Sequence, residues 1–93
     1  MKAERFGSVW DALAKSPEEA QNLMLRSDLM TSIEKAVAAW KLPQGEAAKR
    51  LGITRPRLND LLRGKMSKFS LDALALLAAK AGLKVKLSVK KAA

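Results

Sequence analysis

The sequence predicts an all-α protein, a compact bundle of short helices with an N-terminal helical extension and one C-terminal β-strand. Three observations lead to this prediction. Apolar residues recur at three- and four-residue spacing through most of the chain, which is the period of a helix. Gly, Pro, Ser and Thr interrupt these stretches at positions that begin or end helices. Only residues 83–90 alternate apolar and polar side chains, as a half-buried strand does.

The charge of the chain is strongly uneven. Lys and Arg number 18 against 9 Asp and Glu, so the formal net charge is +9. Residues 1–41 hold as many acidic as basic residues, and the whole excess lies in residues 42–93. This asymmetry indicates that the C-terminal half binds a polyanion. Nucleic acid is favoured over the alternative that the charge serves solubility alone.

The residue types that are missing exclude several kinds of chemistry. The chain has no Cys and no His. Disulfides, thiolate metal sites and cysteine nucleophiles are therefore excluded, and the commonest metal ligand and general base is lacking. We expect no enzyme activity, no cofactor and no metal. The apolar run over residues 73–79 is far shorter than the roughly 20 residues of a membrane helix, and no secretory core follows the first residues. We therefore expect a soluble cytoplasmic protein without a membrane partner.

The first helix is predicted over residues 9–15. Phe6, Val9, Trp10 and Leu13 share one face of it. A helix of two turns is not stable alone. Its two aromatic side chains must therefore pack on the protein's own body, on a second subunit or on another protein.

A long helix is predicted over residues 17–41. Ser16 caps its start and Pro17 suits the first helical position, and no Gly or Pro interrupts it before Pro43. Its apolar face swings round midway along the helix. The segment either breaks near residues 26–28 or forms one helix that serves two partners. We favour the single helix, with its C-terminal half facing the domain core.

Three shorter helices follow, and they are expected over residues 44–51, 55–63 and 71–81. Each is followed or ended by a glycine suited to a helix end, Gly52, Gly64 or Gly82. Thr54 and Ser70 are good caps for the starts of the last two.

The C-terminal strand is predicted from Leu83, Val85, Leu87 and Val89, which alternate with Lys and Ser. Because an unpaired strand is not stable alone, we expect it to pair with its copy in a second subunit, or with a strand of another protein. A loose basic tail is the alternative. The segment also carries Lys84, Lys86 and Lys90. These lysines are expected to form a solvated face, with DNA contact as the alternative.

The most informative stretch is residues 44–64. Two short helices joined by a tight turn that contains Gly52 form a helix-turn-helix. Ala48 is small enough for the two helices to cross closely. Arg55 projects from the N-terminal tip of the second helix, the part that enters the major groove in this motif. The side chains of the second helix expected to face inward are Leu58, Leu61 and Leu62.

This stretch resembles the helix-turn-helix of the phage-repressor and Cro type, the XRE family, and the likeness covers about residues 29–81. It implies a compact lambda-repressor-like fold. Residues 22–30, residues 44–65 and the basic tail carry a narrower resemblance to HigA-like antitoxins. That resemblance implies a bacterial homodimer, associated with the nucleoid, that binds a double-stranded DNA operator, represses its own operon and sequesters a RelE-like toxin. A stand-alone XRE-type regulator without a toxin partner is the alternative.

These resemblances divide the chain and assign its site residues by position. Residues 1–26 would form the arm and the start of the long helix, residues 27–82 the helix-turn-helix DNA-binding domain, and residues 83–93 the basic strand and tail. Base reading is assigned to Arg55, Pro56, Asn59 and Asp60. Phosphate binding is assigned to Gln44, Thr54, Arg57, Arg63, Lys65 and Lys68. Contacts to a second subunit or a toxin are expected from Phe6, Trp10, Leu23, Val85, Leu87 and Val89.

The residue types at these positions differ from the glutamines common in the family. Arg55 can bond guanine with two hydrogen bonds and is expected to read a base, with a phosphate contact as the alternative. Pro56 can only touch a thymine methyl group. Asp60 would repel phosphate, and is expected either to accept from a cytosine amino group or to orient Arg57 or Arg63. Trp40 is expected to be a core or subunit-boundary residue.

Overall fold

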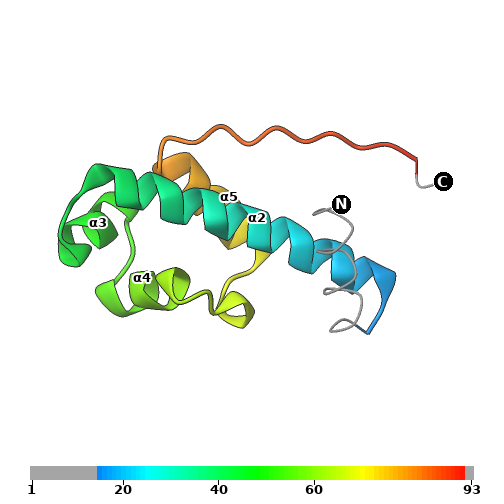
Figure 1. The fold of residues 1–93 in the computed structure, drawn as a ribbon, viewed down its shortest axis with the longest axis horizontal. Helices are drawn as coiled ribbons and strands as arrows, with labels where there is room; N and C mark the ends of the chain where they lie inside the picture. Colours follow the sequence, from blue (N-terminus) through cyan, green and yellow to red (C-terminus); the bar gives the residue numbers. More distant parts are fainter. Residues whose placement is uncertain (1–14, 92–93) are drawn as a thin grey trace.

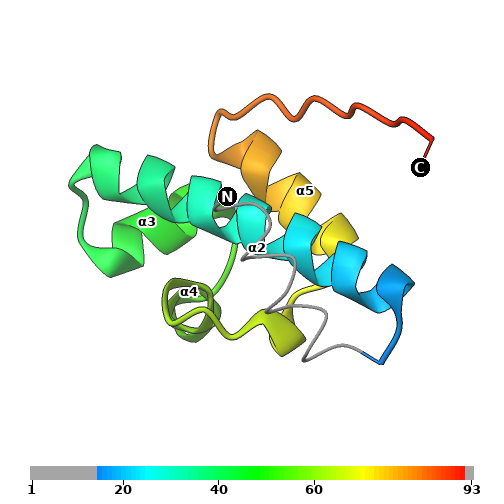
Figure 2. The same cartoon turned by 45° about the vertical axis from the view of Figure 1, so that its right-hand side comes forward.

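The computed structural model describes residues 15–91. Within this range every regular element is a helix, which confirms the predicted all-α class. Its elements are α2 (Pro17–Trp40), α3 (Gln44–Leu51), α4 (Arg55–Leu62), the short 3-10 helix η1 (Met66–Lys68) and α5 (Leu71–Lys80). The long helix α2 runs across the bundle with α5 packed along it, α4 packs on its C-terminal half, and α3 packs on α4 and α5 (Figures 1 and 2). The 3-10 helix is the one described element that the sequence did not predict.

Side-chain caps set where three of these helices begin. Ser16, Thr54 and Ser70 each accept a hydrogen bond from the backbone N–H three residues further on, at 3.1, 3.3 and 3.1 Å. Each cap pairs an N–H group that has no partner within the helix. The predicted starts of α2, α4 and α5 are therefore confirmed.

The helix α2 is uninterrupted, which confirms the prediction of a single helix rather than a break near residues 26–28. It ends at Lys41, whose backbone is left-handed with φ of 54°. Its contribution to the core cluster begins at Leu29, and residues 17–28 supply no member of that cluster. The swing of the apolar face is explained by this division, because the core-cluster members that α2 supplies all come from its C-terminal half.

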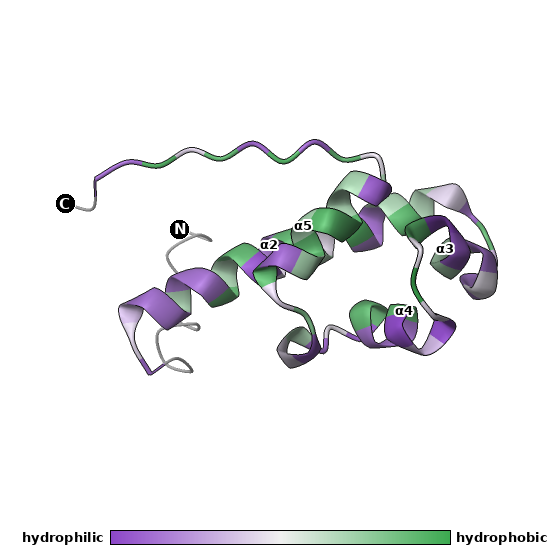
Figure 3. Ribbon diagram, turned by 180° about the vertical axis from the view of Figure 1, so that it is seen from behind, coloured by the Kyte–Doolittle hydropathy of each residue, from purple (hydrophilic) through white to green (hydrophobic). Residues whose placement is uncertain are grey.

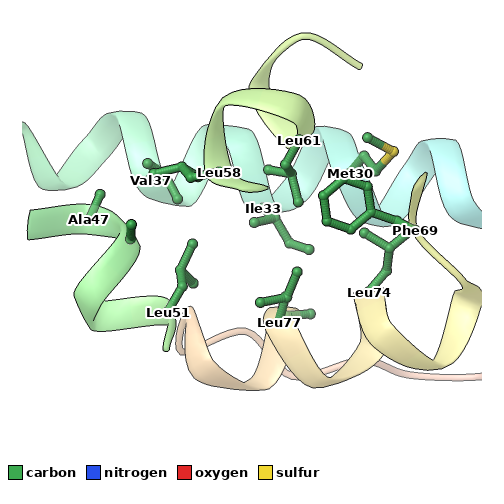
Figure 4. Packing of buried hydrophobic residues seen from close by; sticks show 12 residues of the cluster. Met30, Ile33, Val37, Ala47, Leu51, Leu58, Leu61, Phe69, Leu74 and Leu77 are labelled. Atoms are coloured by element: carbon green, nitrogen blue, oxygen red, sulfur yellow. The ribbon is translucent and has the colours of Figure 1, made fainter. Parts of the chain in front are cut away.

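The core lies where the four α-helices of residues 15–91 meet. Figure 4 shows side chains from all four converging around Ile33 of α2. The largest fully buried side chains are Phe69, Ile33, Leu51, Leu58, Leu61 and Leu74. The prediction that Leu62 faces inward is wrong, since this side chain is 38% exposed. The helix α4 already turns Leu58 and Leu61 to the core, and the next position lies about 100° further round the helix.

The strand predicted over residues 83–90 is not present in the described chain. After α5 the tail runs on without regular secondary structure (Figure 1), and its apolar and polar residues alternate along it (Figure 3). Since no other described segment is a strand, the backbone of the tail has no ladder to join. Val85, Leu87 and Val89 are consequently 52%, 79% and 82% exposed.

Phe6, Trp10 and the helix expected over residues 9–15 lie outside the described residues. None of the described helices combines the length and the apolar character that crossing a membrane requires.

Candidate nucleic-acid interface

The turn between α3 and α4 is built as the sequence predicts. Ala48 is buried, with 2% of its surface exposed, where the two helices cross. Gly52 has a left-handed backbone with φ of 72°, a conformation that costs a side-chain-bearing residue free energy. The next residue, Ile53, donates its N–H to the Ala48 carbonyl at 3.0 Å and closes the end of α3. This turn fixes the angle at which α4 leaves α3.

The helix α4 lies on the side of the bundle opposite to the C-terminal tail (Figures 1 and 2). Leu58 and Leu61 are fully buried, and they fix the rotation of α4 about its own axis. That rotation leaves a solvent-exposed row along the helix and its C-terminal cap, formed by Arg55, Pro56, Asn59 and Arg63. In a helix-turn-helix, the exposed N-terminal part of the second helix is the surface that enters the major groove.

Two predicted phosphate-binding residues lie at helix starts. The hydroxyl of Thr54 caps α4, so a phosphate contact would be a second use of this group. Gln44 is the first residue of α3 and is half-buried. It lines a shallow groove together with Leu58 and Leu62 of α4, which places it beside the second helix of the motif. Glu34 of α2 lines the same groove, and its partial burial there raises the pKa of its carboxyl above the ordinary value of 4.5.

The end of α4 and the loop after it bring together three of the predicted site residues. Gly64 has φ of 71°, and Lys65 donates its N–H back to the Asp60 carbonyl at 3.0 Å. The carboxylate of Asp60 lies 3.4 Å from Lys65 Nζ and 3.7 Å from Lys68 Nζ. Of the two roles expected of Asp60, the structure does not support orienting Arg57 or Arg63, because its carboxylate is paired with these two lysines. The other role, accepting from a cytosine amino group, stays a prediction.

Two arginines hold the same loop from either side. Arg57 of α4 stacks on the ring of Phe69, 4.4 Å from its centre, and donates a hydrogen bond to the Lys68 carbonyl at 3.4 Å. Arg26 of α2 donates through Nη1 to the carbonyls of Met66 and Phe69, at 3.1 and 3.2 Å. The guanidinium predicted to bind phosphate at position 57 is therefore already engaged with the loop.

Sequence reasoning did not identify Arg26. Its Nε donates a hydrogen bond to Asn22 Oδ1 at 2.7 Å, and the two residues lie four positions apart on α2. That spacing is a local signal that a sequence can carry. The bonds to the loop join residues about forty positions apart, and no local pattern predicts them.

Trp40 lies at the edge of the core. It is half-buried and packs against the buried cluster, which supports the core alternative of its interpretation as a core or subunit-boundary residue. The guanidinium of Arg50 lies over its ring at 4.2 Å from the centre. Such a cation–π contact stabilises the packing of α3 on the end of α2.

The basic tail lies away from this surface. Lys84, Lys86 and Lys90 are exposed on the side of the bundle opposite to α4, which favours their interpretation as a solvated face. Among residues 15–91 there is also no cluster of three or more acidic side chains that could hold a metal ion.

Comparison with known proteins agrees with this geometry. The family description of a helix-turn-helix domain matches residues 12–90, which is most of the chain. A search of curated proteins finds no match. The match spans α3, the tight turn and α4 together with the helices that pack on them. The chain therefore belongs to a family of helix-turn-helix domains.

Proposed function

We propose that the protein is a sequence-specific transcriptional repressor that inserts α4 into the major groove of an operator. The observation that carries this proposal is the row of exposed side chains on α4, held outward by two fully buried leucines and flanked by basic residues of the following loop. Repression would follow because a protein bound over a promoter excludes the polymerase.

The side chains of α4 have distinct chemical roles in this proposal. Arg55, in the first turn, offers a planar pair of donors to the O6 and N7 acceptors of guanine. Asn59 has the donor and acceptor needed for adenine, and Pro56 offers only apolar contact to a thymine methyl group. Phosphate contacts would position the helix without reading sequence, and they would come from Gln44, Thr54, Arg57, Arg63, Lys65 and Lys68.

The proposal is tested by replacing Arg55 with Ala and measuring binding to two duplexes. One duplex is enriched by the wild-type protein from a random pool, and the other has a scrambled sequence. We expect Arg55→Ala to lose roughly 1–3 kcal/mol on the enriched duplex and much less on the scrambled one. The control is Lys35→Ala, which removes one positive charge from an exposed position between Ile33 and Val37, on the side of α2 away from them. Equal losses for Arg55→Ala on both duplexes would show that Arg55 reads no base.

We also propose that the protein acts as a homodimer. Helix-turn-helix proteins that bind as dimers place their second helices in major grooves one helical turn apart. An apolar groove lies between α2, α5 and the tail, on the side away from α4, and is lined mainly by Leu25, Leu29, Leu71, Ala75, Leu83, Val85 and Leu87. The exposed apolar side chains of the tail continue this surface. Covering such a surface by a second copy would leave both α4 helices facing outward.

The dimer is tested by sedimentation equilibrium of the full chain. The wild type should sediment as a dimer at micromolar concentration, and Val85→Lys with Leu87→Lys should shift it to the monomer. A wild-type monomer, or a dimer that tolerates both lysines, would contradict this interface.

An antitoxin role is a second candidate function, favoured by the shape of α2. Its N-terminal half, which carries the half-buried Leu23, extends beyond the core cluster. A RelE-like toxin could be held by this half together with the preceding residues. Deleting residues 1–15 should then abolish neutralisation of a co-encoded toxin and spare DNA binding. Neutralisation by the shortened chain would exclude this assignment.

A further inference from the structure

The end of α4 is closed by the same backbone hydrogen bond as two other helix ends, but it carries side chains of a different chemical type. In each of these three turns an N–H bonds the carbonyl five residues earlier, from Ile53 to Ala48, from Lys65 to Asp60 and from Leu83 to Ala78, at 3.0, 3.0 and 2.9 Å. An apolar contact between the two residues usually accompanies this turn. The residue types fit that rule at the ends of α3 and α5. At the end of α4, the proposed recognition helix, they are a lysine and an aspartate.

The same aspartate holds a second lysine from the loop. Its two carboxylate oxygens lie 3.4 Å from Lys65 Nζ and 3.7 Å from Lys68 Nζ. We name Asp60, Lys65 and Lys68 the lysine clasp. The Asp60 side chain is 23% exposed, against 42% and 56% for the lysines, so the carboxylate lies inside and the ammonium groups lie outside.

The backbone of the clasp is fixed independently of its charges. Arg26 donates to the carbonyls of Met66 and Phe69, and Arg57 donates to that of Lys68. Removing the carboxylate should therefore release the two lysine side chains while the loop keeps its path. This separation makes the charge of Asp60 testable apart from the fold.

We propose that Asp60 is a specificity-determining residue, which restrains Lys65 and Lys68 from binding the phosphates of arbitrary duplex DNA. The inference rests on the proposed DNA-binding function and deepens it. Lysine–phosphate contacts are independent of sequence and supply most of the affinity for non-operator DNA. A carboxylate at the edge of α4 pairs with these lysines and repels any phosphate that approaches it.

Asp60 should weaken loosely placed complexes more than the operator complex. On non-operator DNA the protein samples many registers, and phosphates approach the clasp in most of them. On the operator the base contacts of α4 fix one register, in which the outward face of α4 meets base edges rather than backbone. Specificity is a difference between two affinities, and a repulsive element raises it by lowering the weaker one.

The expected effect follows from the charge of the clasp. Two lysines and one aspartate give a net charge of +1, and Asp60→Asn changes it to +2. Each additional neutralised phosphate steepens the dependence of log K on log salt by about 0.9. The affinity gain of Asp60→Asn on scrambled duplex should therefore shrink roughly 3–4-fold between 50 and 200 mM salt. The matched control is Glu18→Gln, which removes the same charge from the exposed first turn of α2.

The test uses fluorescence anisotropy with the full-length protein, on scrambled duplex and on duplex enriched by the wild type. Asp60→Asn should bind scrambled duplex several-fold more tightly than Glu18→Gln does, and its ratio of operator to scrambled affinity should fall. In a background of Lys65→Gln with Lys68→Gln, the change at Asp60 should have no greater effect than the control.

Four results would overturn the inference. An affinity of Asp60→Asn for scrambled duplex equal to that of Glu18→Gln would show that the clasp does not restrain its lysines. The same conclusion would follow if Asp60→Asn still raised this affinity after Lys65 and Lys68 are replaced. A loss confined to the enriched duplex would make Asp60 a base reader instead. If the wild type binds no duplex at all, the proposed function fails, and this inference fails with it.

Discussion

Replacing Gly52 with Ala tests the turn that sets the position of α4. At φ of 72° an added Cβ is strained whatever space surrounds it, and this strain costs roughly 1–2 kcal/mol. The new Cβ would also lie 2.7 Å from Lys80 Nζ, the flexible end of a side chain that can move. Part of the cost is offset, because alanine stiffens the unfolded chain by about 0.4–1 kcal/mol. The net loss should be about 1 kcal/mol.

Two other glycines provide matched controls for this substitution. Gly45→Ala lies in α3, where a Cβ meets nothing within 4 Å, so it has the unfolded-state gain without the strain. Gly64→Ala has the strain, at φ of 71°, without any contact within 4 Å. The free energies of unfolding for Gly52→Ala and Gly45→Ala should therefore differ by roughly 1–2 kcal/mol, the strain itself.

Thermal unfolding followed by circular dichroism measures these differences. For a domain of this size, about 1 kcal/mol corresponds to roughly 4–8 °C in Tm. We expect Gly45→Ala at or above the wild type, and Gly52→Ala and Gly64→Ala both below it. A Gly52→Ala variant as stable as Gly45→Ala would refute the left-handed turn between α3 and α4.

Three further predictions follow from the packing and the charges. Leu74→Ala removes a fully buried side chain and should lower the free energy of unfolding by about 2–5 kcal/mol in urea titration. The control, Leu76→Ala, changes an exposed side chain and should lose no more than about 1 kcal/mol. Arg26→Met should lower affinity for all duplexes in anisotropy, because it removes two hydrogen bonds that hold the lysine clasp; a full-affinity variant would leave Arg26 without that role. Glu34→Gln should raise stability at pH 7 by less than about 0.5 kcal/mol, since burial raises the pKa of this carboxyl and so disfavours its charged form in the fold. That gain should vanish as the pH falls through the raised pKa to below 4.5, and a gain that persists there would contradict the assignment.

The helix starts and the turn could be predicted because their causes are local. Ser16, Thr54 and Ser70 bond a backbone N–H only three residues away, so the chain carries the signal within one turn. The left-handed Gly52 is likewise a property of one position and its neighbours. Short-range chemistry of this kind is visible in the order of residues.

The parts of the candidate site that were not predicted depend on distant partners. Arg26 meets the loop about forty residues later, and the loop geometry then decides which lysines reach Asp60. The inward prediction for Leu62 failed because two other leucines already fill the core side of α4. The predicted strand requires a neighbouring strand, which the order of residues in one chain does not supply.

Arg55, at the exposed start of α4, is proposed to read a guanine in the major groove. The most direct measurement replaces single guanines of the enriched duplex by 7-deazaguanine, which lacks the N7 acceptor, and compares wild type with Arg55→Ala. One substitution in each half-site should weaken binding by the wild type by roughly 1–3 kcal/mol and leave binding by Arg55→Ala unchanged. A wild type indifferent to every such substitution, or an Arg55→Ala variant that loses as much as the wild type, would contradict this proposal.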